Sequence, residues 1–358
     1  MSKFFPLTVA HVRHETRDTI AVTFAVPDAL RESFRYQQGQ HLTLRTHIAG
    51  EDVRRSYSIC SAVQDDKLRV AIKRTPGGLF STWANEALKA GDTLDVMPPM
   101  GHFNVPLASD SARSYVAFAA GSGITPILSI IKTTLLAEPN STFTLFYGNR
   151  ATSSVIFKEE LTDLKDRFLQ RLNLVYVMSR EQQDIDLFNG RITKEKTEQL
   201  LKHWVRVEDF DYAFICGPED MMLGVSAALQ EAGMPKSNIK IELFAASIPK
   251  HEHKPRAIAP EAKHDTQVTV IMDGNATTFT MEKDKESILD AGLRAGLDMR
   301  YSCKGGVCST CRCKVLDGTV DMDVNYALED YEVARGFVLS CQSFPITDNV
   351  VVDFDQAE

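Results

Sequence analysis

The chain has 358 residues, of which 44% are hydrophobic and 25% are charged, with seven cysteines and a formal net charge of −8. A chain of this length has room for two or three domains, and its composition is that of a folded protein with sizeable cores. No window approaches the roughly 18 apolar residues of a membrane span, and the N-terminus lacks a secretory signal pattern, so we expect a cytoplasmic protein.

Residues 1–108 show short runs in which apolar and polar residues alternate between Gly and Asp turns, such as "HLTLRT", "RSYSIC", "LRVAIKR" and "DTLDVM". A series of such runs indicates an antiparallel barrel or sandwich. Two stretches carry candidate binding groups. The motif Arg55-Ser56-Tyr57-Ser58 combines a guanidinium, which can grip a phosphate, with an aromatic ring and two hydroxyls, and Gly77-Gly78 with Ser81 forms a glycine turn.

Residues 109–246 alternate apolar runs with helical patterns. The strand-like runs are "YVAFAA", "FTLFY", "LNLVYVM", "YAFIC" and "IKIEL". This alternation indicates βαβ units, and therefore a parallel sheet with helices on both faces.

Two of these strands run into turns that open a helix. "FAAGSGITP" places Gly121 and Gly123 where glycine lets the backbone approach a phosphate and a helix N-terminus offers free N–H groups. "FICGPEDMM" places Cys216 at the end of another strand. A short glycine pair is often a plain turn, but two such loops at strand ends of one parallel sheet outline a ligand cleft.

The residues after two further strands favour NADPH over NADH. NAD sites usually place Asp or Glu on the ribose hydroxyls, whereas NADP sites use arginine near the 2′-phosphate. Here Asn149-Arg150 and Ser179-Arg180 follow the two strands. Alternatively, either arginine is only paired on the surface.

A stretch with three prolines and three histidines, residues 247–265, has no apolar periodicity and is typical of a linker. Residues 266–358 then show two strand-like runs around Asp273-Gly274, a helical segment "ESILDAGLRAG" and a final strand "NVVVDF". From Thr266 onward 8 Lys and Arg face 16 Asp and Glu, a balance of −8 that equals the net charge of the whole chain. This acidic α+β unit argues against nucleic acid as a partner.

Four cysteines of the C-terminal domain have iron–sulfur spacing. They are Cys303, Cys308, Cys311 and Cys341. The first three are separated by four and two residues, and the last follows after 29 more, which is the plant-type [2Fe–2S] arrangement. Zinc is the main rival, but structural zinc sites usually take ligands as two close pairs. Gly305 and Gly306 allow backbone N–H groups near the sulfides, and Cys313 is expected to be a small buried side chain.

The motifs of the first two domains resemble the ferredoxin-NADP reductase superfamily, and "YSCKGGVCSTCRCKV" with "LSCQ" resembles plant-type ferredoxins. The first resemblance implies that the R-x-Y-S motif holds FAD. Arg55 would grip its phosphate, Tyr57 would lie on the isoalloxazine, and Ser58 would hydrogen-bond near N5, with Ser56 also in contact. Gly77, Gly78 and Ser81 match the family's second phosphate loop. FMN serves some reductases of this domain order, and no single residue excludes it.

In the nucleotide domain the same resemblance implies that Gly121 and Gly123 lie over the pyrophosphate and that Thr125 contacts the nicotinamide end. It places Cys216 near the nicotinamide ring, so that Cys216 and Ser58 are the candidate catalytic residues. The remaining candidate contacts to the cofactors are Arg150, Ser179, Arg180 and Phe244.

The whole chain, over residues 4–356, resembles the reductase components of multicomponent oxygenases. The expected fold is an FAD-binding antiparallel β-barrel (1–108), an NAD(P)-binding parallel α/β domain (109–246), the linker (247–265) and a β-grasp ferredoxin-like domain (266–358). The resemblance implies an oxidoreductase that passes electrons from NADPH through FAD and a [2Fe–2S] cluster to a di-iron oxygenase complex. Another acceptor, such as a ring-hydroxylating dioxygenase, is the alternative enzyme function. A colourless, zinc-stabilised nucleotide-binding module is the non-enzymatic one.

Overall fold

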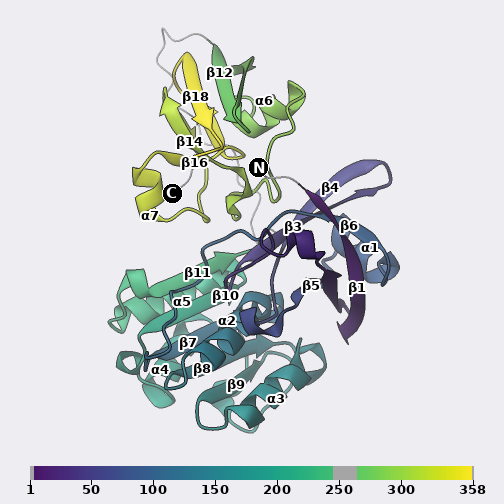
Figure 1. The fold of residues 1–358 in the computed structure, drawn as a ribbon. Helices are drawn as coiled ribbons and strands as arrows, with labels where there is room; N and C mark the ends of the chain where they lie inside the picture. Colours follow the sequence, from purple (N-terminus) through teal and green to yellow (C-terminus); the bar gives the residue numbers. More distant parts are fainter. Residues whose placement is uncertain (1–3, 245–263, 357–358) are drawn as a thin grey trace. The chain divides into compact units, whose positions relative to one another are not determined.

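The computed structural model describes residues 4–244 and 264–356, which divide into two compact units. The larger unit contains the described residues 4–53 and 57–244, and the smaller contains 54–56 and 264–356. The larger unit holds the sheets of the first two domains, and the smaller unit holds its own sheets (Figure 1). Most of the predicted linker lies outside the described residues. Within those residues no helix has both the length and the apolarity needed to cross a membrane.

Six strands form the barrel, in the order β4-β3-β6-β1-β2-β5. They are β1 Phe5–Thr16, β2 Thr19–Ala25, β3 His41–Ile48, β4 Glu51–Ser58, β5 Leu68–Lys73 and β6 Thr93–Val96. The chain leaving β4 pairs with β5 through an antiparallel bridge between Ile59 and Val70, and Cys60 N–H donates to the Arg69 carbonyl at 2.8 Å. These bonds close the sheet on itself, so the barrel alternative is confirmed over the sandwich. Helix α1 (Leu79–Ala87), which was not predicted from the sequence, begins directly after the Gly77-Gly78 turn.

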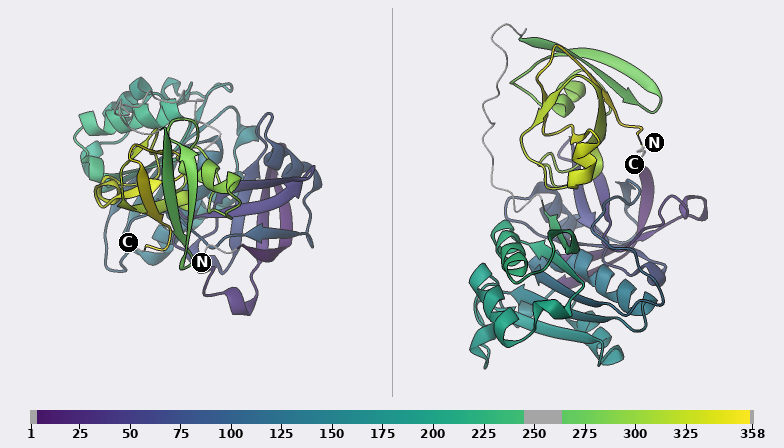
Figure 2. Two further views of the ribbon diagram at one scale, coloured as in Figure 1. Left: turned by 90° about the horizontal axis from the view of Figure 1, so that it is seen from above. Right: turned by 90° about the vertical axis from the view of Figure 1, so that its left-hand side faces the viewer.

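Five parallel strands form the central sheet, in the order β11-β10-β7-β8-β9. They are β7 Ser114–Ala120, β8 Thr142–Asn149, β9 Leu172–Met178, β10 Tyr212–Gly217 and β11 Ile239–Leu243. The helices between them are α2 Ile124–Ala137, α3 Lys158–Arg167, α4 Lys194–His203 and α5 Glu219–Glu231. Because crossovers between parallel strands are right-handed, α2 and α3 cover one face and α4 and α5 the other (Figure 2). The predicted α/β architecture is confirmed.

The strand order of the central sheet changes direction at β7. From β7 the chain continues outward to β8 and β9, and then returns to place β10 on the other side of β7. Ala119 of β7 pairs with Cys216 of β10, so the two loops that leave these strands lie at one edge. This is the topological switch point at which open α/β sheets bind ligands.

The smaller unit has a mixed sheet in the order β13-β12-β18-β14-β16 and a two-stranded sheet β15-β17. The strands are β12 Asp265–Met272, β13 Asn275–Glu282, β14 Arg312–Asp317, β15 Val320–Met322, β16 Phe337–Leu339, β17 Ser343–Pro345 and β18 Asn349–Asp353. The helices are α6 Ile288–Arg294 and α7 Asp330–Ala334. Strands β12 and β13 form the long green hairpin of Figure 2. Its turn residues Asp273 and Gly274 both have positive φ, at 52° and 75°. The terminal strand β18 runs parallel to β12, and α6 buries Ile288 and Leu289 in the core of this unit, as expected for a β-grasp fold.

Candidate functional site

A cleft of about 670 Å³ opens at the carboxyl edge of the central sheet. Both loops at the switch point, the segment after β5, the segments after β8 and β9, and the residue after β11 line it. The predicted site residues that line it are Gly121, Gly123, Arg150, Ser179, Arg180 and Phe244. Residues predicted separately from short motifs therefore meet in one cleft.

The two glycines of the first loop serve different purposes. Gly121 has φ at 53°, in the left-handed region that a side chain disfavours. Gly123 has ordinary torsions, but a Cβ there would overlap the backbone carbonyl of Cys216. Gly123 is therefore needed for the close approach of the two loops, in addition to any contact with a ligand.

Three arginines give the cleft a strongly cationic side. Arg150 and Arg180 are neighbours, because the ladder of β8 and β9 extends past the strands and Arg180 N–H donates to the Arg150 carbonyl at 2.8 Å. Arg191 also lines the cleft. Among the described residues none of these guanidiniums has a carboxylate within ion-pair distance. Cations without a carboxylate partner suit an anionic ligand such as a phosphorylated nucleotide.

Arg191 was not predicted from the sequence. Its signal was available, since Gly190-Arg191 immediately precedes the predicted helix near 193–202. What the sequence could not supply was the position of that helix start, which lies at the same edge as Arg180.

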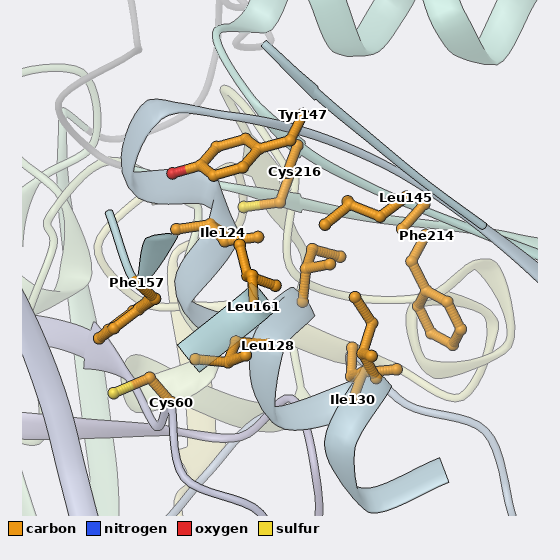
Figure 3. Packing of buried hydrophobic residues seen from close by; sticks show 14 of the residues in the cluster. Cys60, Ile124, Leu128, Ile130, Leu145, Tyr147, Phe157, Leu161, Phe214 and Cys216 are labelled. Carbon is orange, nitrogen blue, oxygen red and sulfur yellow. The ribbon is translucent and has the colours of Figure 1, made fainter. Parts of the chain in front are cut away.

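Thr125 and Cys216 do not line the cleft. The Thr125 hydroxyl is buried and donates to the Ser122 carbonyl at 3.0 Å. Cys216 is fully buried, and Figure 3 shows its sulfur among Ile124 and Tyr147 of the hydrophobic core. Burial, with a further contribution from the charge of Glu242, raises the pKa of the Cys216 thiol well above its usual value. The contact of either residue with nicotinamide stays a prediction.

Ser58, at the end of β4, meets an acid that the sequence analysis did not identify. The Ser58 hydroxyl donates to Glu242 of β11 at 2.9 Å, across the junction of the barrel and the α/β domain. Burial raises the pKa of Glu242 from 4.5 to about 7, and the hydrogen bond from Ser58 opposes the shift. The available signal was an acid inside the apolar strand "IKIEL". The pair can hold or release a proton near neutral pH.

Glu242 is expected to make stability pH-dependent in a defined direction. The pKa of Glu242 is higher in the folded chain (about 7) than the ordinary 4.5. Its contribution to the free energy of unfolding is therefore full below pH 4.5 and is lost as the pH rises through 7. The midpoint of thermal unfolding of the wild type should therefore fall more steeply between about pH 5 and 8 than that of Glu242→Gln. Glu159→Gln, at an exposed position of α3, is the matched control. Equal slopes for wild type and Glu242→Gln would contradict the assignment.

The other barrel motifs lie in two segments. Tyr57 packs against Phe80 with ring centroids 5.6 Å apart, and the exposed Arg55 donates to the Arg54 carbonyl at 2.7 Å. Ser56 is half-buried on the same strand. Contact of this motif with FAD stays a prediction.

The glycine turn after β5 borders a second cavity of about 420 Å³. Lys73, Arg74 and Gly77 line it. Gly77 has φ at 71°, and the Ser81 hydroxyl accepts from Thr75 N–H at 3.1 Å. A Cβ on Gly78 would meet that hydroxyl at 2.5 Å. The predicted phosphate loop is thus a tight turn with cations beside it, which fits a pyrophosphate.

The four predicted cluster ligands gather in the smaller unit. The Cys308 and Cys303 sulfurs lie 3.1 Å apart, and Gly305 N–H donates to the Cys303 sulfur at 3.3 Å. Strand β16 pairs with β14, and Ser340 N–H donates to the Cys311 carbonyl at 3.1 Å, which brings Cys341 to the loop despite its distance in sequence. An all-thiol set with backbone N–H groups on sulfur suits an iron–sulfur cluster.

In residues 4–244 and 264–356 no group of three or more His, Cys, Asp or Glu side chains has the arrangement to hold a metal ion. The ligand roles of the four cysteines therefore stay a prediction, which rests on their spacing in the sequence and on their position near one another in the smaller unit. Cys313 is buried in the core of the smaller unit, as expected.

Two basic residues beside the cysteine loop, Lys304 and Arg312, have contacts within their own unit. Lys304 lies 2.8 Å from Asp290, and Arg312 lies 2.9 Å from the buried Glu332 and over the Phe337 ring. Arg312 therefore has a structural role.

Comparison with known proteins adds three family models and several relatives. The models are an oxidoreductase FAD-binding domain at residues 6–105, an oxidoreductase NAD-binding domain at 118–227 and a 2Fe-2S iron-sulfur cluster binding domain at 270–345. The chain is 48% identical over 355 residues to a subunit of the 1,2-phenylacetyl-CoA epoxidase of Escherichia coli (strain K12), covering 99% of each. It is 36% identical over 354 residues to the ferredoxin reductase component of the 3-ketosteroid-9-alpha-monooxygenase of Rhodococcus rhodochrous, covering 97% of this chain and 96% of the relative.

Among solved structures, phthalate dioxygenase reductase matches with a TM-score of 0.59 and 22% identity, and the match covers 98% of each chain. At this identity the likeness shows the fold alone. The sheets described above therefore have the same type of fold as that reductase.

Proposed function

Because the chain belongs to the family of oxygenase reductases that combine FAD-binding, NAD-binding and [2Fe–2S] domains, we propose that it is the reductase of a phenylacetyl-CoA epoxidase. The observation that carries this proposal is the 48% identity to the epoxidase component of Escherichia coli, which extends over 99% of both chains and therefore over all three domains. Its electron acceptor is then a di-iron oxygenase complex in phenylacetate degradation, and its donor is NADPH. We place it in the cytoplasm, where thiols are kept reduced.

When bound, FAD and the [2Fe–2S] cluster would supply the coupling between a two-electron donor, NADPH, and a one-electron acceptor. The chain's own residues supply binding and orientation. Arg180 and Arg191, which have no carboxylate partner in the described chain, hold the 2′-phosphate, and the loop at Gly121 and Gly123 holds the pyrophosphate. Phe244 lines the cleft beside them.

Ser58 and Glu242 have a separate task in this proposal. They lie where the barrel and the α/β domain meet, which is where a flavin on the barrel and a nicotinamide on the sheet would face each other. A carboxyl group with a pKa of about 7 can hold a proton at the Ser58 hydroxyl oxygen and release it at physiological pH. No other side chain is required to move a proton.

The proposal is tested by reconstitution. The protein loaded with FAD and cluster is mixed with the purified di-iron oxygenase component, phenylacetyl-CoA, NADPH and oxygen, and consumption of phenylacetyl-CoA is followed. We expect turnover that requires the reductase and uses one NADPH per substrate oxidised. NADPH oxidation with ferricyanide but no turnover with this oxygenase would show that the chain serves another oxygenase. A preparation without flavin and iron would contradict the electron-transfer function itself.

A further inference from the structure

The side chain of Glu181 joins two segments of the nucleotide cleft. Its carboxylate accepts a hydrogen bond from Thr152 N–H at 2.7 Å and another from the Thr152 hydroxyl at 2.5 Å, one on each oxygen. Thr152 begins the short turn η4 (Thr152–Ser154) just after Arg150, and Glu181 directly follows Arg180. Each of the joined segments therefore carries one of the cleft's arginines.

These bonds extend an existing ladder. Ser179 N–H donates to the Asn149 carbonyl at 2.9 Å and Arg180 N–H to the Arg150 carbonyl at 2.8 Å, beyond the last paired residues of β8 and β9. Glu181 adds the next connection, through its side chain. A backbone that is already fixed on both sides limits the ordering that a ligand must supply when it binds the arginine side chains.

The same two bonds govern the charge beside Arg180. The Thr152 hydroxyl, and then its backbone N–H, lower the pKa of Glu181, so the carboxylate stays ionised. Both of its oxygens are engaged by Thr152, and no ion pair forms between Glu181 and Arg180 among the described residues. An acid near the ribose is the usual acceptor for the hydroxyls of NAD. Here both oxygens of the acid that follows β9 already accept hydrogen bonds from Thr152.

We propose that Glu181 and Thr152 form a clamp that holds the segments of Arg150 and Arg180 together and thereby sets the preference of the cleft for NADPH over NADH. The clamp rests on the proposed function, because it presumes that Arg180 binds the 2′-phosphate. Glu181 and Thr152 are positioning residues, since they act on the nucleotide through the arginines. The acid itself contributes by being withdrawn from the ribose.

The test uses the protein loaded with FAD and cluster, with ferricyanide as acceptor. KM and kcat are measured for NADPH and NADH, together with the inhibition constants of 2′-AMP and 5′-AMP, which report binding without turnover. For Glu181→Ala, which removes both hydrogen bonds to Thr152, we expect KM for NADPH and the inhibition constant of 2′-AMP to rise about tenfold, with kcat little changed. KM for NADH and the inhibition constant of 5′-AMP should stay within about twofold.

Three further variants sharpen the test. Thr152→Val removes the hydroxyl but keeps the shape of the side chain and the backbone N–H, and should raise the inhibition constant of 2′-AMP about threefold. Thr152→Ser keeps a hydroxyl and should behave as wild type. Glu159→Ala, on α3, removes the same charge outside the cleft and controls for the net-charge change. If Glu181→Ala loses FAD or unfolds, Thr152→Val decides.

Two outcomes would overturn the clamp, and they are distinguishable from failure of the proposed function. If the Glu181 and Thr152 variants weaken the binding of NADPH and NADH equally, or of neither, the two residues do not set selectivity. If Arg180→Ala leaves the ratio of kcat/KM for NADPH to that for NADH unchanged, Arg180 does not bind the 2′-phosphate. The proposed function of the arginines and the clamp are then both wrong. If Arg180→Ala lowers the ratio and the clamp variants do not, only the clamp is wrong.

Discussion

Replacing Cys341 with alanine is expected to remove the [2Fe–2S] cluster and to lower electron delivery to the oxygenase by at least about 100-fold, because the cluster supplies the one-electron step. Cys341 follows β16, whose pairing with β14 brings it to the loop of Cys303, Cys308 and Cys311. Iron and acid-labile sulfide per chain, and the visible spectrum, measure the cluster. NADPH oxidation with ferricyanide measures what remains of the flavin path, and it should stay within about threefold of wild type.

Cys313→Ala is the matched control for this experiment. Cys313 is a buried thiol two residues from Cys311, and it lies in the core of the same unit. Its replacement should cost about 1 kcal/mol of stability through the lost sulfur, and the two irons should remain. Iron that persists in Cys341→Ala, or that is lost equally from Cys313→Ala, would show that the ligand set has been misassigned.

Replacing Arg180 with alanine is expected to raise KM for NADPH about 10- to 100-fold while KM for NADH changes less than about threefold. The guanidinium lines the cleft and has no ion-pair partner in the part of the chain that the structure describes, so it is available for a phosphate. Replacing Arg191 as well should raise KM for NADPH further, because both guanidiniums are proposed to bind the same 2′-phosphate dianion. Steady-state kinetics with ferricyanide, repeated at several salt concentrations, measure both effects.

Arg206→Ala is the matched control for the arginine variants. Arg206 pairs with Asp209 at 2.8 Å on an exposed segment before β10, and it does not line the cleft. Its replacement makes the same change in net charge and should leave both KM values unchanged. A proportional loss for NADPH and NADH in Arg180→Ala would contradict a contact with the 2′-phosphate, since NADH lacks that group.

The sequence by itself determined those features that depend on residues close together in the chain. The alternation of apolar runs with helical patterns predicted the parallel sheet, because each βαβ unit is a local sequence pattern. Asp273-Gly274 predicted the β12–β13 hairpin, because both residues tolerate the positive φ that its turn requires. The spacing of Cys303, Cys308 and Cys311 and the two glycine loops likewise predicted candidate sites, since each of these motifs lies in one short segment.

Only the tertiary structure decided which distant residues meet. Ser58 and Glu242 are 184 positions apart, and their hydrogen bond exists because β11 lies where the barrel joins the central sheet. Arg191 reaches the cleft because the crossover after β9 returns along the opposite face of the sheet. Cys216 points into the core because of the side of its strand on which it lies, a choice that a one-residue change of register would reverse. Strand order, closure and register are set by the packing of the whole domain, and no short motif contains them.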